Sequence, residues 1–172
     1  KWNYYGFLER NGKPAVIRYK NGKIKEEYWF YNDILDRQGN EPAITFHYDN
    51  DVISDEYWYQ NNVLVREDNK SAHNRFYENG SFMSLEIYQN EQLQSINDNP
   101  AYIEYYKNED INVYGPKKIE EWYENGKLDR PGDQPAFLSY YENGRNEEFR
   151  WCRFDKIHRE GNKPARLIYY DK

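Results

Sequence analysis

Two residue types recur at a nearly fixed spacing, and this repetition restricts the chain to a repeat architecture. Every tryptophan and every alanine belongs to one of two series, and Ile87 fills the one gap in the tryptophan series. The series are Trp2, Trp29, Trp58, Trp122 and Trp151, and Ala15, Ala43, Ala72, Ala101, Ala136 and Ala165. A period of about 29 residues is typical of stacked repeat proteins. We therefore expect one array over residues 1–172, with units at 2–28, 29–57, 58–86, 87–121, 122–150 and 151–172.

Three turn-prone positions recur in each unit. Two of them carry Asn-Gly or a related pair, three residues after the tryptophan series and near the end of the unit, as in Asn125-Gly126 and Asn143-Gly144. Asn-Gly is a strong hairpin signal, because both central residues of a type I′ turn need a positive φ. The third position carries Gly, Asp or Asn, which tolerate a left-handed backbone. With the Pro-Ala that follows it, this position indicates a kink or bulge, because proline cannot donate a ladder hydrogen bond.

The segments between the turns have the ring-rich and β-branched composition of half-exposed strands, as in AITFHY and AFLSYY. Two reversals per unit keep successive units equivalent, so each unit is predicted to be one long β-hairpin. Short turns join antiparallel neighbours. The predicted fold is therefore all-β: an elongated array of six β-hairpin repeats that form a twisted antiparallel meander of about twelve strands.

The composition excludes several classes of protein. Val, Ile, Leu and Phe make up only about 19% of the chain, a share typical of disorder, but 19 Tyr and 5 Trp supply the missing apolar area. No apolar stretch is long enough to span a membrane. The net charge of −6, with acids and bases mixed along the chain, argues against nucleic acid and anionic membranes as partners. The single Cys152 suits a cytoplasmic location, in the host cytoplasm or in a virion if the protein is viral.

An arginine series follows the tryptophan series by eight residues. Its members are Arg10, Arg37, Arg66, Arg130 and Arg159, with Ser95 in the fourth unit. We expect these residues to make a repeated structural contact, either as ion pairs with acids such as Glu26, Asp55 and Glu120 or as cation–π stacks on the rings. An anion-binding row is the alternative. For the tryptophan series, we expect a ring-filled core face, and the alternative is an exposed aromatic row that binds sugars.

Catalysis has no support in the sequence. The histidines His47, His73 and His158 fall at unrelated positions and lack the spacing of metal ligands. Carboxylate pairs such as Glu26-Glu27 recur with the repeat, whereas a catalytic pair needs two different environments in one pocket. We therefore predict a protein that is not an enzyme and that needs no cofactor or metal.

The departures from the repeat are the best candidates for a specific site. The fourth unit has Ile87 for Trp and Ser95 for Arg, and six extra residues separate Asn108 from Trp122. Insertions in repeat proteins form loops, often on the binding face. The alternative is a neutral lengthening of one hairpin tip. The candidate binding loop consists of Glu109, Asp110, Ile111, Asn112, Val113, Tyr114, Gly115, Pro116, Lys117 and Lys118.

The unit pattern WYxNGKLxRxGxxPAxIxYYxNG, closest in the segment KIHREGNKPARLIYY, resembles the MORN-type repeats. It is most similar to a variant group found in bacterial antitoxin-like proteins, phages and large DNA viruses, and the resemblance covers essentially the whole chain. It implies an interaction or structural module. Our leading hypothesis is thus a non-enzymatic module for protein–protein interaction or scaffolding, with a protein partner and with self-association through open sheet ends as a further option. The alternatives are a carbohydrate-binding aromatic ladder and an antitoxin-like inhibitor of a partner enzyme.

Overall fold

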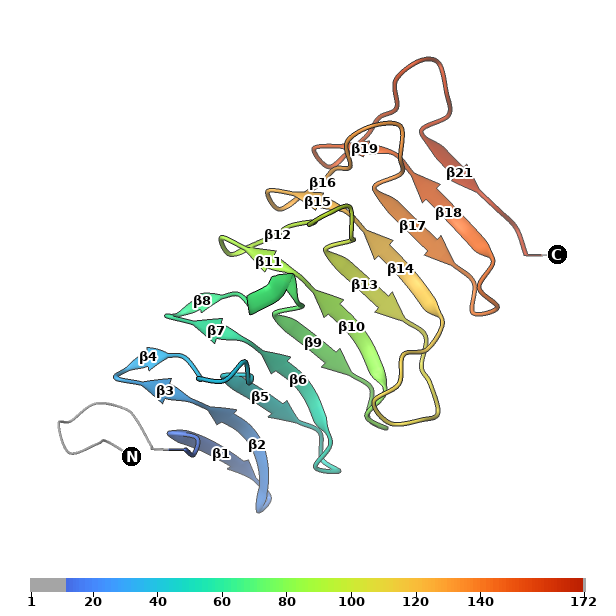
Figure 1. Cartoon of the computed structure of the whole chain (residues 1–172). Coiled ribbons are helices and arrows are strands. Elements are labelled where there is room, and N and C mark those ends of the chain that lie inside the picture. Colours follow the sequence, from blue (N-terminus) through green and yellow to red (C-terminus); the bar gives the residue numbers. More distant parts are fainter. Residues whose placement is uncertain (1–11, 172) are drawn as a thin grey trace.

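The computed structural model describes residues 12–171, so that Trp2 and Arg10 lie outside the described part of the chain (Figure 1). One large antiparallel sheet consists of β1 (Val16–Lys20), β2 (Lys23–Tyr28), β5 (Ile44–His47), β6 (Ile53–Tyr57), β9 (His73–Phe76), β10 (Phe82–Glu86), β13 (Tyr102–Tyr105), β14 (Lys117–Glu121), β17 (Phe137–Tyr140), β18 (Asn146–Arg150) and β21 (Arg166–Ile168). These 11 strands lie in the sheet in chain order, which confirms the predicted meander.

Five short hairpins continue from this sheet. They are β3 (Phe30–Tyr31) with β4 (Ile34–Leu35), β7 (Tyr59–Gln60) with β8 (Val63–Leu64), β11 (Tyr88–Gln89) with β12 (Gln92–Leu93), β15 (Tyr123–Glu124) with β16 (Lys127–Leu128), and β19 (Cys152–Arg153) with β20 (Lys156–Ile157). The one helical element of the described residues is a 3-10 turn, η1 (Glu67–Asn69). Each predicted hairpin arm is therefore split into a long and a short strand, and the number of units remains a prediction.

The split occurs at the tryptophan series. The backbone of each member forms hydrogen bonds with two separate segments of the chain. The Trp29 N–H donates to the Ala43 carbonyl at 2.8 Å, and the Trp29 carbonyl accepts from the Asp36 N–H at 3.4 Å. The same two bonds recur at the four following members of the series, with Ile87 in place of Trp. The residues between the two bonded segments leave the sheet as a loop, so the predicted bulge is an enlarged one. We call these segments the arginine loops: residues 37–42, 66–71, 95–100, 130–135 and 159–164.

The left-handed position predicted in these loops is confirmed. All five arginine loops have a positive φ there, from 52° at Asn97 to 87° at Gly39. The tips of the short hairpins are also as predicted, since both turn residues have a positive φ in every one of them.

The turns at the opposite end of the sheet differ from the prediction. Only Asn21-Gly22 has a positive φ at both residues, whereas Asp51, Gly80 and Gly144 are left-handed alone in their turns. The register shifts of the sheet lie beside these turns, as between Phe46 and His47. The Asn side chain explains the difference, because its Oδ1 accepts the N–H two residues later and favours a longer turn, as in Asn50 with Val52 at 3.2 Å.

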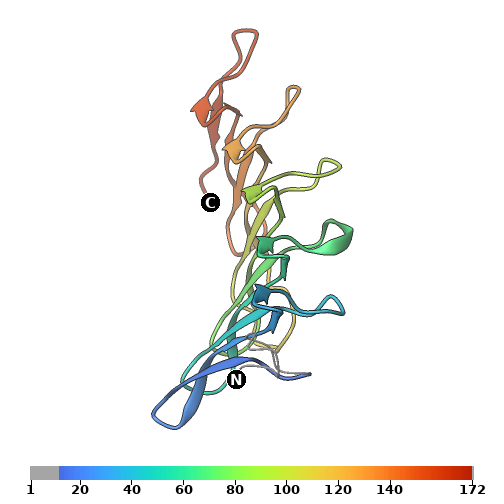
Figure 2. The same cartoon turned by 90° about the vertical axis from the view of Figure 1, so that its left-hand side faces the viewer.

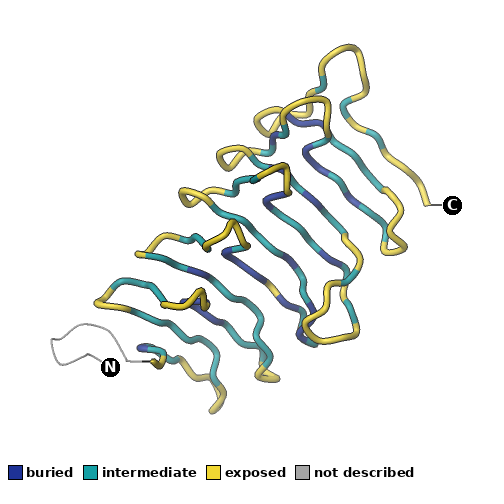
Figure 3. Tube along the Cα trace, in the orientation of Figure 1, coloured by how far each residue is buried: buried dark blue, intermediate teal, exposed yellow. Residues whose placement is uncertain are grey.

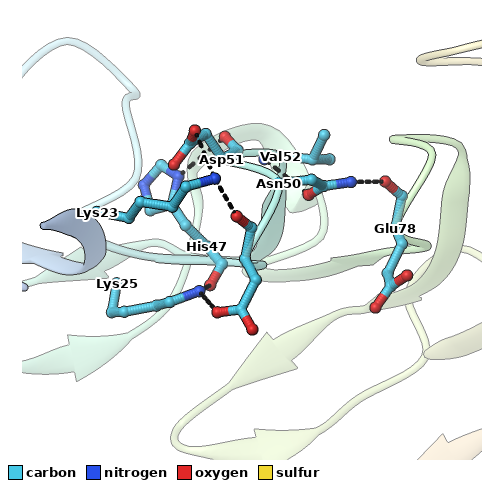
Figure 4. A network of polar contacts seen from close by, with 8 residues as sticks. Lys23, Lys25, His47, Asn50, Asp51, Val52 and Glu78 are labelled. Carbon is cyan, nitrogen blue, oxygen red and sulfur yellow. Dashed lines mark hydrogen bonds and ion pairs between the residues drawn. The ribbon is translucent and has the colours of Figure 1, made fainter. Parts of the chain in front are cut away.

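Side chains at these turns bind each unit to the next. Figure 4 shows Asn50 donating to the Glu78 carbonyl at 2.7 Å, beside the ion pair of Lys23 with Asp51 at 3.3 Å. A tyrosine series adds a second link, since the Tyr48 hydroxyl donates to a backbone carbonyl of the following unit at 2.7 Å. Equivalent bonds start from Tyr77, Tyr106 and Tyr141. The sequence analysis did not single out this tyrosine series.

The core follows the line where the sheet meets the arginine loops. The short hairpins and loops project from one side of the twisted sheet (Figure 2), and buried residues gather where the strands meet them (Figure 3). The most buried apolar residues on this line are Ala43, Ala72, Ala101 and Ala136, each at most 1% exposed. The carbonyl of each of these alanines accepts the N–H of the tryptophan-series residue in the same unit, as Ala43 does from Trp29.

Candidate functional site

The tryptophan and arginine series form one repeated contact. In each described unit that has both residues, the guanidinium lies over the indole ring of the same unit, at 3.7–4.0 Å from the ring centroid. The guanidinium also donates to the carbonyl that ends its arginine loop, as from Arg130 to Pro135 at 3.3 Å. The expected structural contact is therefore a cation–π stack, and it closes the loop over the ring.

The same pair reaches back to the preceding arginine loop. The Trp122 indole donates to the Asp98 carbonyl at 2.9 Å, and Arg130 binds the Asp98 carboxylate at 2.9 and 3.0 Å. Arg159 pairs with Asp133 at 2.6 and 3.1 Å in the same way. The ion pairs thus use acids of the loops and not the strand acids suggested from the sequence.

Three indole rings of this series are covered, whereas Trp29 is only partly buried. Trp58, Trp122 and Trp151 are only 5–7% exposed. An arginine stacked on each of these rings occupies the face that a sugar would need. The ring-filled core expected from the sequence matches this burial.

The fourth unit lacks this contact, because Ile87 and Ser95 replace the two partners. The row of short hairpins is interrupted at the same place. Elsewhere in the described residues each short hairpin binds the next through a backbone bond, as from the Gly126 N–H to the Leu93 carbonyl at 3.0 Å. No such bond joins the short hairpin of the third unit, β7 and β8, to that of the fourth unit, β11 and β12. Leu64 and Glu91 hold the equivalent positions there. The neighbouring hairpins are therefore less tightly joined here.

A side-chain bond is missing at the same junction. The Asn61 N–H donates to the Asp36 carboxylate at 3.1 Å, and the Asn125 N–H donates to the Gln94 side chain at 2.8 Å. Val65 holds the equivalent place in the third unit and has no acceptor for the Asn90 N–H. The short hairpins of the third and fourth units thus share fewer polar contacts than the other neighbouring hairpins.

The insertion folds back onto the third unit. The Tyr114 ring stacks on Phe82 at 4.3 Å, and the Asn112 N–H donates to the Gly80 carbonyl at 3.1 Å. Gly115 permits this path, since a Cβ there would lie 1.9 Å from the Tyr106 carbonyl oxygen. The insertion leaves apolar side chains in solvent: Ile111 is 66% exposed and Tyr114 is 48% exposed.

Two of these departures, Ile87 and Tyr114 of the insertion, line one pocket of about 580 Å³. Apolar groups from both units line it, among them Trp58, Phe82, Leu85, Ile87, Ile103 and Tyr114. Polar groups line the remainder, among them Arg66, Asn69, Ser71, Asn74 and Glu56. Burial raises the pKa of the Glu56 carboxyl, against the opposing effect of its bond from Asn74 at 3.4 Å. We take this pocket, with the adjoining insertion, as the candidate functional site.

The site contains only part of the residues singled out from the sequence. Trp58, Arg66 and Tyr114 line the pocket. The remaining residues of the candidate loop do not line it, and Lys117 and Lys118 belong to β14, where they pair with Glu120 and Glu104 at 2.6 Å. Glu56 and Asn74 were not predicted to lie together at this site, because only the strand register shows that they face the same side of the sheet as Leu85.

A second polar group lies on the opposite face of the sheet. The His73 ring stacks on Tyr57 at 4.0 Å and lies 3.2 Å from the Asp55 carboxylate and 3.1 Å from that of Glu86. Burial lowers the pKa of His73, but its hydrogen bonds and the charges of both carboxylates outweigh burial and raise the pKa above 6.5. Over residues 12–171 no cluster of His, Cys, Asp and Glu is arranged to hold a metal ion.

Comparison with known proteins gives no relative for this arrangement. No protein-family model, no curated protein and no solved structure matches the chain. Within the described residues no helix is long and apolar enough to cross a membrane.

Proposed function

We propose that this protein is a non-enzymatic repeat scaffold that binds a partner protein at the pocket between its third and fourth units. One observation carries this proposal: the departures from the repeat gather at a single place. Ile87, Val65 and the insertion are far apart along their units, yet each alters the same junction. Neutral departures would be scattered over all units.

The exposed side chains favour a protein over a small molecule. Ile111 and Val113 are 66% and 42% exposed beside Tyr114, in a chain whose mean hydropathy is −1.24. Apolar and tyrosine side chains around a pocket are typical of the centre of a protein interface. The covered indole rings, by contrast, weigh against the carbohydrate-binding alternative.

The proposal includes two narrower possibilities. An antitoxin-like inhibitor would use the same surface with an enzyme as its partner, and a MORN-type module would use it as a scaffold. Self-association with a second copy of the chain, through sheet edges, is a further option. We place the function in the cytoplasm, where the free and buried Cys152 would stay reduced.

A pull-down from a lysate of the native host tests the proposal. The variant lacks residues 110–115 and carries Glu109→Gly and Pro116→Ser, which reproduces the turn at Gly80 and Ser81 of the preceding unit. We expect the natural chain to capture a partner and the shortened chain to lose it. Ile157→Ser is the matched control, because Ile157 is also exposed, at 56%, but lies on β20 away from the pocket. Capture of the same partner by the shortened chain would contradict the proposed surface, and no capture by either chain would contradict protein binding.

A further inference from the structure

The arginine loop of the third unit presents a carbonyl without the indole N–H that the loops before Trp58 and Trp122 receive. In the loop of the fourth unit, the Asp98 carbonyl accepts the Trp122 indole N–H at 2.9 Å. Asn69 holds the equivalent place, with a φ of 56° against 60° at Asp98. The next unit offers Ile87 there, and an isoleucine side chain has no donor.

The side chain of Asn69 also lacks the arginine partner that its counterpart Asp98 has. The Asp98 carboxylate is bound at 2.9 and 3.0 Å by Arg130, which also covers the indole ring. Ser95 replaces that arginine opposite Asn69 and is too short to reach across. The Asn69 Oδ1 has only a long contact, with the Gln89 amide at 3.5 Å.

Space is available at the same place. Asn69 and Ile87 both line the 580 Å³ pocket, whose volume lies within the range of about 300–1,000 Å³ typical of ligand sites. The short hairpins beside this place lack the backbone bond between Leu64 and Glu91 that joins other neighbouring hairpins. The protein itself thus shows which group such a place accepts, since every other described unit fills it with an indole ring.

We propose that the partner inserts a tryptophan side chain into this pocket, with its indole N–H donating to the Asn69 carbonyl. The ring would lie against Ile87 and beside Arg66, in the manner of Trp122 in the following unit. A buried tryptophan anchor in a preformed pocket is a common source of binding energy in protein interfaces. This inference rests on the proposed function and names the group that the scaffold recognises.

A small probe tests the inference without knowledge of the partner. N-acetyl-tryptophanamide is titrated into the full ¹⁵N-labelled chain, and we expect amide shifts at Asn69, Lys70 and Ile87 with a Kd of about 1 mM. The 1-methylindole analogue has the same ring without the N–H. It should bind about threefold to tenfold more weakly, which corresponds to the loss of one hydrogen bond.

A repeat-restoring variant provides the matched test. Ile87→Trp with Ser95→Arg rebuilds the pair found in the other units, so it should raise the thermal midpoint and weaken probe binding by at least about tenfold. Val63→Trp is the control, because it adds the same side chain to a short hairpin, at a residue that does not line the pocket. This control should bind the probe like the natural chain.

Three results would overturn the inference: equal binding of the methylated probe, shifts elsewhere in the sheet, or unchanged probe binding by the restored variant. The first result does not depend on whether any variant folds. The pull-down separates this inference from the proposed function. If the restored variant still captures the partner, the tryptophan anchor is excluded and protein binding stands, whereas a natural chain that captures nothing excludes protein binding itself.

Discussion

At the scale of single residues, the stability of the array depends on pairs that act within a unit and between units at once. Arg130 covers the Trp122 ring, closes its own loop and binds Asp98 of the preceding loop. The Arg130 guanidinium holds the pKa of the Asp98 carboxyl below 3.8. One arginine therefore joins a ring, a loop and a neighbouring unit, which explains why the sequence repeats it at a fixed distance from tryptophan.

Replacement of this arginine should be costly. Arg130→Ala removes a cation–π contact and several charged hydrogen bonds, so we expect the free energy of unfolding to fall by about 2 kcal/mol. Urea denaturation followed by tryptophan fluorescence measures the change. Arg145→Ala is the control, because that side chain is 66% exposed and its pair with Asp171 should contribute less than about 0.5 kcal/mol. Equal effects of the two substitutions would contradict this account.

The His73 group predicts a pH dependence of stability. The pKa of His73 is raised above 6.5, so its stabilisation is present below pH 6.5 and is lost as the pH rises through the higher folded pKa. Burial raises the pKa of Asp55 and Glu86, but His73 outweighs burial and lowers both below 3.8 and 4.5. Their stabilisation is present above those values and is lost as the pH falls.

Stability should therefore be greatest between pH 4.5 and pH 6.5 and fall above that window. We expect a loss in the free energy of unfolding between about pH 6 and pH 8. Denaturant titrations at both pH values measure it. The variant His73→Gln should lack this loss, while His158→Gln, at an exposed position, should retain it. A loss that persists in His73→Gln would show that another group is responsible.

At the scale of elements, the short hairpins form a second row of contacts beside the main sheet. Adjacent hairpins share a backbone bond and a side-chain bond. The exception is the pair formed by β7 and β8 of the third unit and β11 and β12 of the fourth unit. The side-chain bond is lost here because a single residue, Val65, offers no acceptor atom. The junction that borders the pocket is thus the weakest in this row.

Restoration of that acceptor should strengthen the junction. Val65→Asp gives the Asn90 N–H the partner that Asp36 provides for Asn61, and we expect its amide exchange to slow by about fivefold, as for a bond worth about 1 kcal/mol. Hydrogen exchange followed by NMR measures this rate. Val63→Asp, two residues away on the exposed edge of the hairpin, should leave the Asn90 rate unchanged. Unchanged exchange in Val65→Asp would mean that the two hairpins are too far apart for this bond.

The sequence predicted the elements better than the site. The hairpin tips and the left-handed loop position follow from Asn and Gly alone, because they are backbone requirements of single residues. The splitting of each arm at tryptophan did not follow, since it depends on two backbone bonds made by one residue. The pocket itself was not predicted, and the sequence pointed to this place only through Ile87, Ser95 and the insertion. Glu56 and Asn74 meet across two strands whose register no local pattern specifies.

At the scale of the whole molecule, the described strands of the sheet pair only with their neighbours in chain order. From β1 to β21, the order of the strands across the sheet is the same as their order along the chain. The stability of such an array is close to a sum of unit terms and interface terms. Damage at one end should therefore stay local.

Truncation tests this locality. A chain that ends at Arg150 lacks β19, β20 and β21, and we expect the amides of β5 to β14 to keep their hydrogen-exchange protection within about threefold. Only β17 and β18 should lose protection. A matched chain carrying Trp58→Ala, in which a central unit is damaged, should lose protection on both sides of that unit. Global unfolding of the truncated chain would contradict an additive array.

Chain order in the sheet also has a consequence for synthesis on the ribosome. Because β5 needs only β2 and β6, a hairpin can be completed while the units that follow it have not yet been translated. Its growing edge remains open until the next strand emerges and covers it. Each newly made unit thus serves as the template for its successor, and the pocket between the third and fourth units forms only after the fourth unit has been translated.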